Sequence, residues 1–125
     1  MDARELTRDE KKKIRKFFEI LGDCPEVAEE KLEAYAILTA MGPTYLWFQW
    51  EALKELGLSF GLTAGETEKA LVKMVKGAVK TLYQAKRTPG EVMDLIPVKP
   101  LGEDEATIRQ IYRAKLTGLY AKLKG

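Results

Sequence analysis

Few side chains in this sequence could carry out chemistry by themselves. The chain has no histidine, which removes the commonest metal ligand, the usual general base and every Ser-His or Cys-His pair. Cys24 is the only cysteine and has no base beside it in the sequence, so we expect an unreactive thiol, no internal disulfide and a reducing compartment. Two segments with glycine and proline are notable, residues 42–45 (GPTY) and 100–102 (PLG), and three acids at 103–105 follow the second. No catalytic or metal-binding residue is predicted.

These residues and the aromatic residues near them have a structural interpretation. A Gly-Pro pair such as Gly42-Pro43 is most often a turn between helices, because proline cannot continue the hydrogen-bond ladder. Tyr45, Trp47 and Trp50 are typical of a core or an interface. The acids at 103–105 are typical of a helix start, where they complement the helix dipole.

The first segment lies in an uncharged run, residues 34–50, which Glu33 and Glu51 close. The run is shorter than the ~20 apolar residues of a membrane span and contains Gly-Pro, two threonines and a glutamine. We therefore expect it to be buried on nearly all sides, either by the chain's own helices or by a second copy.

The bulk composition predicts one folded domain and limits the partners. The chain has 125 residues, 21 lysines and arginines and 19 acids, for a net charge of +2. That balance argues against nucleic acid, and the one basic cluster, Lys11–Lys13, is predicted to be a solvated helix start. The charged N-terminus predicts no signal peptide and therefore a cytoplasmic protein.

Three Thr-x-x-Glu capping boxes predict helix starts at Thr7, Thr63 and Thr88. Combined with apolar periodicity and an absence of β-alternation, they predict an all-α protein of five or six helices. Gly77, inside one helix, predicts a close helix crossing. The expected helices span residues 8–21, 30–40, 43–60, 64–87 and 91–96, and a last one carries Ile108 to Leu123.

An ordered set of landmarks gives the chain a family resemblance. They are Glu29–Leu32 (EEKL), Leu38–Tyr45 (LTAMGPTY), Leu58–Leu62 (LSFGL), Lys76–Ala78 (KGA), Thr88–Gly90 (TPG) and Val98–Pro100 (VKP). In this order and spacing they resemble the C-terminal dimerisation domain of pyrroline-5-carboxylate reductase. The fold so implied is a helical bundle like the 6-phosphogluconate dehydrogenase C-terminal-like dimerisation domain, intertwined as a homodimer.

The resemblance also implies a function. Members of the family transfer a hydride from NAD(P)H to a cyclic imine, producing proline, so a complete enzyme would use NADP or NAD. It implies that residues 1–28 are an N-terminal helix and connector and that residues 29–125 are the dimerisation and substrate domain. The implied partners are a homodimer or a higher homo-oligomer and, as a further option, a separate dinucleotide-binding domain, with no nucleic acid and no membrane. The residues that it assigns to substrate binding are Gly42, Pro43, Thr44, Tyr45, Pro100 and Gly102.

The sequence departs from the family pattern at two places. No Gly-x-Gly-x-x-Gly is present, so we expect no cofactor on this chain and no activity from it alone. Leu101 replaces a glycine of the family's Pro-Gly-Gly loop, and the three acids that follow would repel a carboxylate. An alternative is therefore a free-standing helical homodimer that acts as an interaction module. A third possibility is a protein that binds a partner helix or peptide through its Trp47–Trp50 surface.

Overall fold

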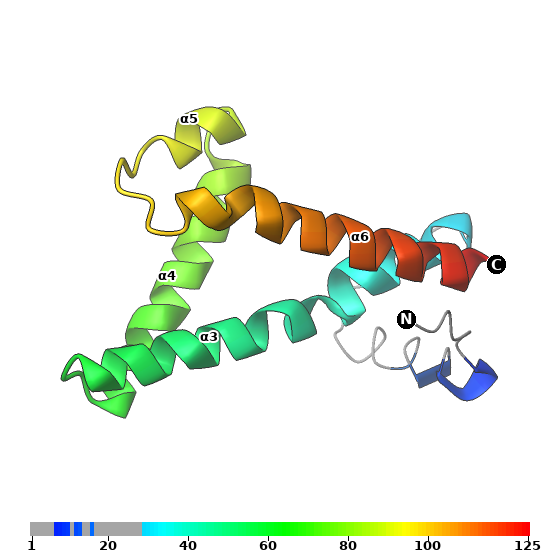
Figure 1. Ribbon diagram of the computed structural model, residues 1–125, viewed down its shortest axis with the longest axis horizontal. Coiled ribbons are helices and arrows are strands. Elements are labelled where there is room, and N and C mark those ends of the chain that lie inside the picture. The colour runs from blue at the N-terminus through cyan, green and yellow to red at the C-terminus, as the bar shows by residue number, and fades with distance from the viewer. Residues whose placement is uncertain (1–6, 11, 14–15, 17–28) are drawn as a thin grey trace. The chain divides into compact units, whose positions relative to one another are not determined.

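The computed structural model describes residues 7–10, 12, 13, 16 and 29–125. Within this part of the chain the protein is all-helical, without strands, as predicted. Its elements are η1 (Glu29–Lys31), α2 (Leu32–Tyr35), η2 (Ala36–Ala40), α3 (Gly42–Ser59), α4 (Ala64–Gln84), α5 (Pro89–Met93), η3 (Gly102–Asp104) and α6 (Glu105–Lys124) (Figure 1).

The chain divides into two compact units. The first contains the chain up to Leu46 together with Glu103–Gly125, and the second contains Trp47–Gly102. In the first unit α2 packs against α6. Lys124, at the end of α6, donates a hydrogen bond to the Glu30 carbonyl at 2.7 Å, and its Nζ lies 3.7 Å from Glu33 Oε2. In the second unit α4 follows α3 after a tight turn, and α5 packs against α4 (Figure 1).

All three predicted capping boxes are present. At Thr7, Thr63 and Thr88 the threonine Oγ1 accepts from the backbone N–H three residues later, and the glutamate there accepts from the threonine N–H. Each box satisfies amides that a helix start leaves without partners. The predicted helix 8–21 and Cys24 lie mostly outside the described residues, although Lys12 and Lys13 are helical and exposed as expected.

The segment before Gly42 is helical, as predicted, but its winding changes twice. A 3₁₀ turn (η1) leads into one α-turn (α2), and a π-turn (η2) follows, in which Met41 N donates to the Ala36 carbonyl at 2.9 Å. The proline ring at position 43 would clash with the carbonyl four residues earlier and has no N–H to donate, so the α-helical ladder cannot continue through it. The sequence predicted the break at Gly42-Pro43 but not the wider turn before it.

Helix α3 ends where predicted. Gly61 has φ +101°, the Leu62 N–H donates to the Gly57 carbonyl, and the Gly61 N–H donates to the Leu58 carbonyl. This is a Schellman motif, which needs a glycine in the left-handed conformation.

Two other helix bounds differ from the prediction. Helix α4 ends at Gln84 and not near Arg87, and α5 covers Pro89–Met93 and not 91–96. The physical reason is the N-cap of α5. Thr88 precedes Pro89 and is therefore extended (φ −71°, ψ 155°), so α4 has to end before it.

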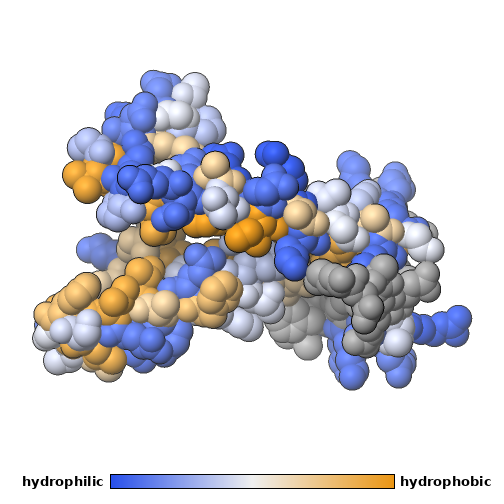
Figure 2. Space-filling view, viewed as in Figure 1, coloured by the Kyte–Doolittle hydropathy of each residue, from blue (hydrophilic) through white to orange (hydrophobic). Residues whose placement is uncertain are grey.

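The buried apolar core of the described residues is small. It consists of Ala36, Ile37 and Ala40, in the uncharged run. In the same run Leu38, Trp47 and Phe48 are exposed, so the expectation that the chain's own helices bury it on nearly all sides is wrong for these residues. A β-carbon at Gly77 would meet nothing within 4 Å, so the close crossing predicted there is not made by the described part of this chain either. Figure 2 shows hydrophobic side chains on the surface over α3 and α4.

Candidate functional site

The GPTY segment forms the first turn of α3. Pro43 occupies the position in this turn where its missing N–H costs nothing. The Thr44 N–H donates to the Met41 carbonyl at 3.0 Å, and Thr44 Oγ1 donates to the same carbonyl at 2.5 Å. The threonine hydroxyl is therefore engaged within its own turn. Gly42 is buried, yet a β-carbon there would meet nothing within 4 Å, so open space lies beside this backbone.

Tyr45 connects this turn to the preceding π-turn and to α6. Its hydroxyl donates to the Ile37 carbonyl at 2.5 Å, and its ring meets the Tyr112 ring edge to face, with centroids 5.9 Å apart and planes at 78°. Burial raises the pKa of the Tyr45 hydroxyl above its ordinary value of 10.0, and the neighbouring Tyr112 raises this pKa further. Tyr45 thus stays protonated at neutral pH and acts as a donor that holds the turn, not as a base.

The second segment, Pro100–Gly102, lies at the end of the second unit. The Gly102 N–H donates to the Lys99 carbonyl at 2.9 Å, so this amide is already used in closing a turn. Lys99 Nζ lies 3.5 Å from Asp94 Oδ1 on the same loop. The side chain of Leu101 is 66% exposed. The acids at 103–105 begin η3 and α6, as the structural interpretation predicted, and Glu105 pairs with Arg109 at 3.2 Å.

The six candidate substrate residues thus fall into two groups. Gly42, Pro43, Thr44 and Tyr45 are consecutive in the first unit, whereas Pro100 and Gly102 belong to the second. The sequence did not predict the two contacts of Tyr45, which are the hydrogen bond to the Ile37 carbonyl and the ring contact with Tyr112. No local pattern in the sequence indicates that Tyr45 pairs with Tyr112, which lies 67 residues away.

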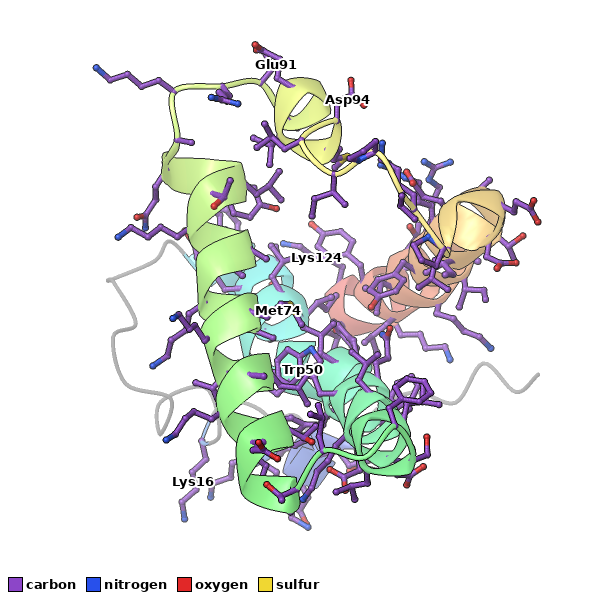
Figure 3. The ribbon with its side chains drawn as sticks, turned by 90° about the vertical axis from the view of Figure 1, so that its left-hand side faces the viewer. Lys16, Trp50, Met74, Glu91, Asp94 and Lys124 are labelled. Atoms are coloured by element: carbon purple, nitrogen blue, oxygen red, sulfur yellow. The ribbon has the colours of Figure 1, made fainter. Side chains whose placement is uncertain are left out.

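A groove between α3 and α4 forms a third feature of the surface. It has a volume of about 470 Å³, and Trp50 projects into it from α3 towards α4 (Figure 3). Its apolar wall consists of Trp47, Trp50, Leu71, Val72 and Val75. Lys54 on α3 bridges the two helices with a 2.7 Å hydrogen bond to Glu68 on α4, which raises the pKa of the Lys54 ammonium.

The described part of the chain contains neither a cluster of metal ligands nor a membrane-spanning helix. No group of three or more His, Cys, Asp or Glu side chains there could hold a metal ion. None of the helices in that part is both long enough and apolar enough to cross a membrane.

Comparison with known proteins identifies the family of this helical domain. A family model described as pyrroline-5-carboxylate reductase dimerisation matches residues 29–123. Pyrroline-5-carboxylate reductase of Corynebacterium melassecola is 26% identical over 118 residues, which are 94% of this chain and 43% of that protein. Pyrroline-5-carboxylate reductase 2 of Bos taurus is 30% identical over 74 residues, covering 59% of this chain and 23% of that protein.

A solved structure shares the fold. The crystal structure of Plasmodium falciparum pyrroline carboxylate reductase with NADP bound matches with a TM-score of 0.54 at 21% identity, over 95% of this chain and 48% of that one. This chain therefore spans less than half the length of these relatives. Since the family model covers residues 29–123 of the 125, the chain belongs to the pyrroline-5-carboxylate reductase dimerisation family.

Proposed function

We propose that this chain is the dimerisation and substrate domain of a pyrroline-5-carboxylate reductase-like protein, and that two copies of it pair through their helices. The observation that carries the proposal is the set of apolar side chains that the chain leaves exposed on α3 and at the residue after it. Leu53, Leu56 and Phe60 recur at the spacing of one helix face and are 44%, 50% and 78% exposed. A soluble monomer rarely exposes such a continuous apolar face, and a second copy would cover it.

Helix α6 also exposes apolar side chains that a second copy would cover. Ile108 and Ile111 are exposed on this helix, three residues apart, next to the half-buried Tyr112. The start of the family match at residue 29 supports a domain boundary there, with residues 1–28 as helix and connector.

Native mass across a dilution series tests the pairing. We expect light scattering to give a dimer that persists at micromolar concentration, and Leu56→Lys to raise the dissociation constant by at least about tenfold. Glu55→Lys is the matched control, because it places the same side chain on the same helix at an exposed position outside the apolar face. A monomeric wild-type chain, or an equal effect of the two substitutions, would overturn the proposal.

For the complete protein we propose reduction of 1-pyrroline-5-carboxylate to proline by NADPH or NADH. The residues of this chain do not themselves fit a dinucleotide. Its described part has no strand, and its sequence has no Gly-x-Gly-x-x-Gly to bring a backbone close to a pyrophosphate. The hydride donor would have to be held elsewhere, and a separate dinucleotide-binding domain in the cytoplasm would be a partner.

Within this domain we propose a role in substrate binding for Gly42, Pro43, Thr44 and Tyr45 of the first unit and, separately, for Pro100 and Gly102 of the second. The open space beside Gly42 supports a ligand there. Binding of L-proline, followed by NMR chemical shifts with D-proline as control, tests the site, and Gly42→Ala should weaken the binding without unfolding the chain.

A non-catalytic interaction module remains the second candidate. The exposed Leu101 and the acids at 103–105 favour it. Leu101 replaces a glycine of the family's loop, and the acids would repel the carboxylate of a substrate. Dimerisation without any binding of L-proline would support this candidate over the substrate domain.

A further inference from the structure

The π-turn before Gly42 pairs its backbone in a way that leaves one carbonyl for a side chain. In an α-helix the Met41 N–H would donate to the carbonyl four residues earlier, that of Ile37. Here it donates to the Ala36 carbonyl, five residues earlier, at 2.9 Å. The Ile37 carbonyl accepts from the Tyr45 hydroxyl, at 2.5 Å. The side chain of Tyr45 thus takes the place of a backbone amide.

This exchange of donors matters because the carbonyl belongs to a buried residue. Ile37 is 6% exposed, so water would not readily replace a missing donor there. Without the Tyr45 hydroxyl the π-winding would leave the Ile37 carbonyl unpaired, whereas an α-winding would pair it with the Met41 N–H. The hydroxyl therefore favours the π-winding over the α-winding.

The Gly-Pro break does not by itself decide between the two windings. Pro43 has no N–H for the carbonyl four residues earlier, and that carbonyl belongs to Thr39 and not to Ile37. Met41 keeps its own N–H and could donate it to Ile37 in an ordinary α-helix. A second determinant is needed, and Tyr45 supplies it.

Tyr112 on α6 holds the side chain that makes this bond. Its ring meets the Tyr45 ring edge to face, with centroids 5.9 Å apart and planes at 78°. This geometry is favourable for two aromatic rings, and the contact limits the directions open to the Tyr45 ring. Both tyrosines are half-buried and belong to the first unit, as the π-turn does. The contact therefore connects α6 to the winding of the turn.

The winding before Met41 sets the direction of the GPTY segment. The Thr44 N–H and Oγ1 both donate to the Met41 carbonyl, so the segment follows this residue as one piece. An α-helix turns by about 100° per residue, so a shift of one residue in the pairing would rotate the segment by roughly that angle. Such a rotation would redirect the open space beside Gly42.

We propose that Tyr112 is a positioning residue for the substrate turn. Through the Tyr45 hydroxyl it keeps the turn in its π-winding and so sets the direction in which Gly42 faces a ligand. The ligand part rests on the role in substrate binding proposed above for residues 42–45, and the winding part is independent of it. A chain in the α-winding would have to rewind before binding, so its apparent affinity would fall with the fraction in the π-winding.

The pairing of the Met41 amide reports the winding directly. Trans-hydrogen-bond scalar couplings, measured by NMR on the perdeuterated whole chain, connect an amide nitrogen to the carbonyl carbon that accepts from it. In wild type we expect the Met41 nitrogen to couple to the Ala36 carbonyl carbon. In Tyr45→Phe and in Tyr112→Leu this coupling should weaken, and a coupling to the Ile37 carbonyl carbon should appear. Tyr112→Phe, which keeps the ring, should retain the wild-type coupling.

Binding of L-proline, followed by chemical shifts with D-proline as control, tests the ligand part. Tyr45→Phe and Tyr112→Leu should each raise the dissociation constant at least about threefold, and Tyr112→Phe should leave it near the wild-type value. Tyr83→Leu is the matched control, because it makes the same substitution at a tyrosine on α4 that is 75% exposed, and it should change neither measurement.

Two outcomes would overturn the inference. The first is an unchanged coupling between Met41 and Ala36 in either Tyr45→Phe or Tyr112→Leu. The second is wild-type affinity for L-proline in a variant whose coupling has moved to Ile37. Absence of L-proline binding to the wild-type chain would overturn the proposed substrate role, and the couplings would still decide whether the two tyrosines select the winding.

Discussion

Gly57 on α3 and Thr67 on α4 pack so closely that a β-carbon at position 57 would lie 2.7 Å from Thr67 Cγ2 and 3.0 Å from its Oγ1. Both residues are buried, and Thr67 Oγ1 donates to the Thr63 carbonyl at 2.8 Å, at the start of α4. The contact therefore joins the end of one helix to the cap of the next. It fixes how α3 meets α4, and hence the groove between them.

Gly57→Ala should lower the free energy of unfolding by about 1–3 kcal/mol, because the added methyl overlaps a side chain that is itself held by a hydrogen bond. Urea denaturation measures this effect. Gly77→Ala is the matched control: nothing lies within 4 Å of its β-carbon, so alanine in the helix interior should raise stability by about 0.5–1 kcal/mol. Destabilisation by Gly77→Ala would instead place a partner helix against that position.

Removing the Tyr45 hydroxyl should destabilise the turn before α3. Tyr45→Phe leaves the Ile37 carbonyl without this donor at a partly buried site, so we expect a loss of about 1 kcal/mol in urea denaturation. Tyr83→Phe, at a side chain that is 75% exposed, should have no measurable effect. Equal stability of the two variants would show that the hydroxyl does not hold the π-turn.

The raised pKa of Tyr45 also predicts a response to alkali. The folded chain holds this proton more tightly than the unfolded chain, so the contribution to stability is complete below the ordinary value of 10.0 and is lost as pH rises through the raised pKa. Absorbance titration of the phenolates should therefore show one tyrosine fewer ionising above the ordinary value in Tyr45→Phe than in wild type.

The sequence predicted local features better than distant ones. The capping boxes at Thr63 and Thr88 were predictable because a cap involves residues only three positions apart, and the Gly61 stop because a left-handed residue needs glycine. The π-turn was not predictable, since the same apolar residues suit an ordinary helix. The contacts of Tyr45 with Ile37 and Tyr112 depend on tertiary packing.

Burial was the feature that composition could not decide. The uncharged run is compatible with a core or with an interface. The exposure of Leu38, Trp47 and Phe48 in the folded chain favours an interface for these residues.

The glutamates of two capping boxes should make stability depend on pH in acid. The pKa of Glu66 is lowered below its ordinary value of 4.5, mainly by the hydrogen bond from the Thr63 backbone N–H and next by a hydrogen bond with the Thr63 side chain. The Thr88 backbone and side chain lower the pKa of Glu91 in the same way. Their contribution is therefore present above that value and is lost as pH falls through the lowered pKa. Glu66→Gln combined with Glu91→Gln should lower Tm at neutral pH and match wild type once both carboxyls are protonated. Glu55→Gln at neutral pH is the control for the substitution itself, because this exposed side chain is not part of a capping box.

The 125-residue chain by itself should neither bind NADPH nor oxidise it in the presence of 1-pyrroline-5-carboxylate. A hydride transfer needs its donor held against the acceptor, and the described residues contain no strand followed by a glycine-rich turn that could hold a pyrophosphate. Absorbance of NADPH follows turnover, and emission from Trp47 and Trp50 follows binding. The reductase of Corynebacterium melassecola, 26% identical over 94% of this chain, serves as the positive control. Turnover by the pure chain would show that its helices hold the dinucleotide in a way that no glycine-rich loop explains.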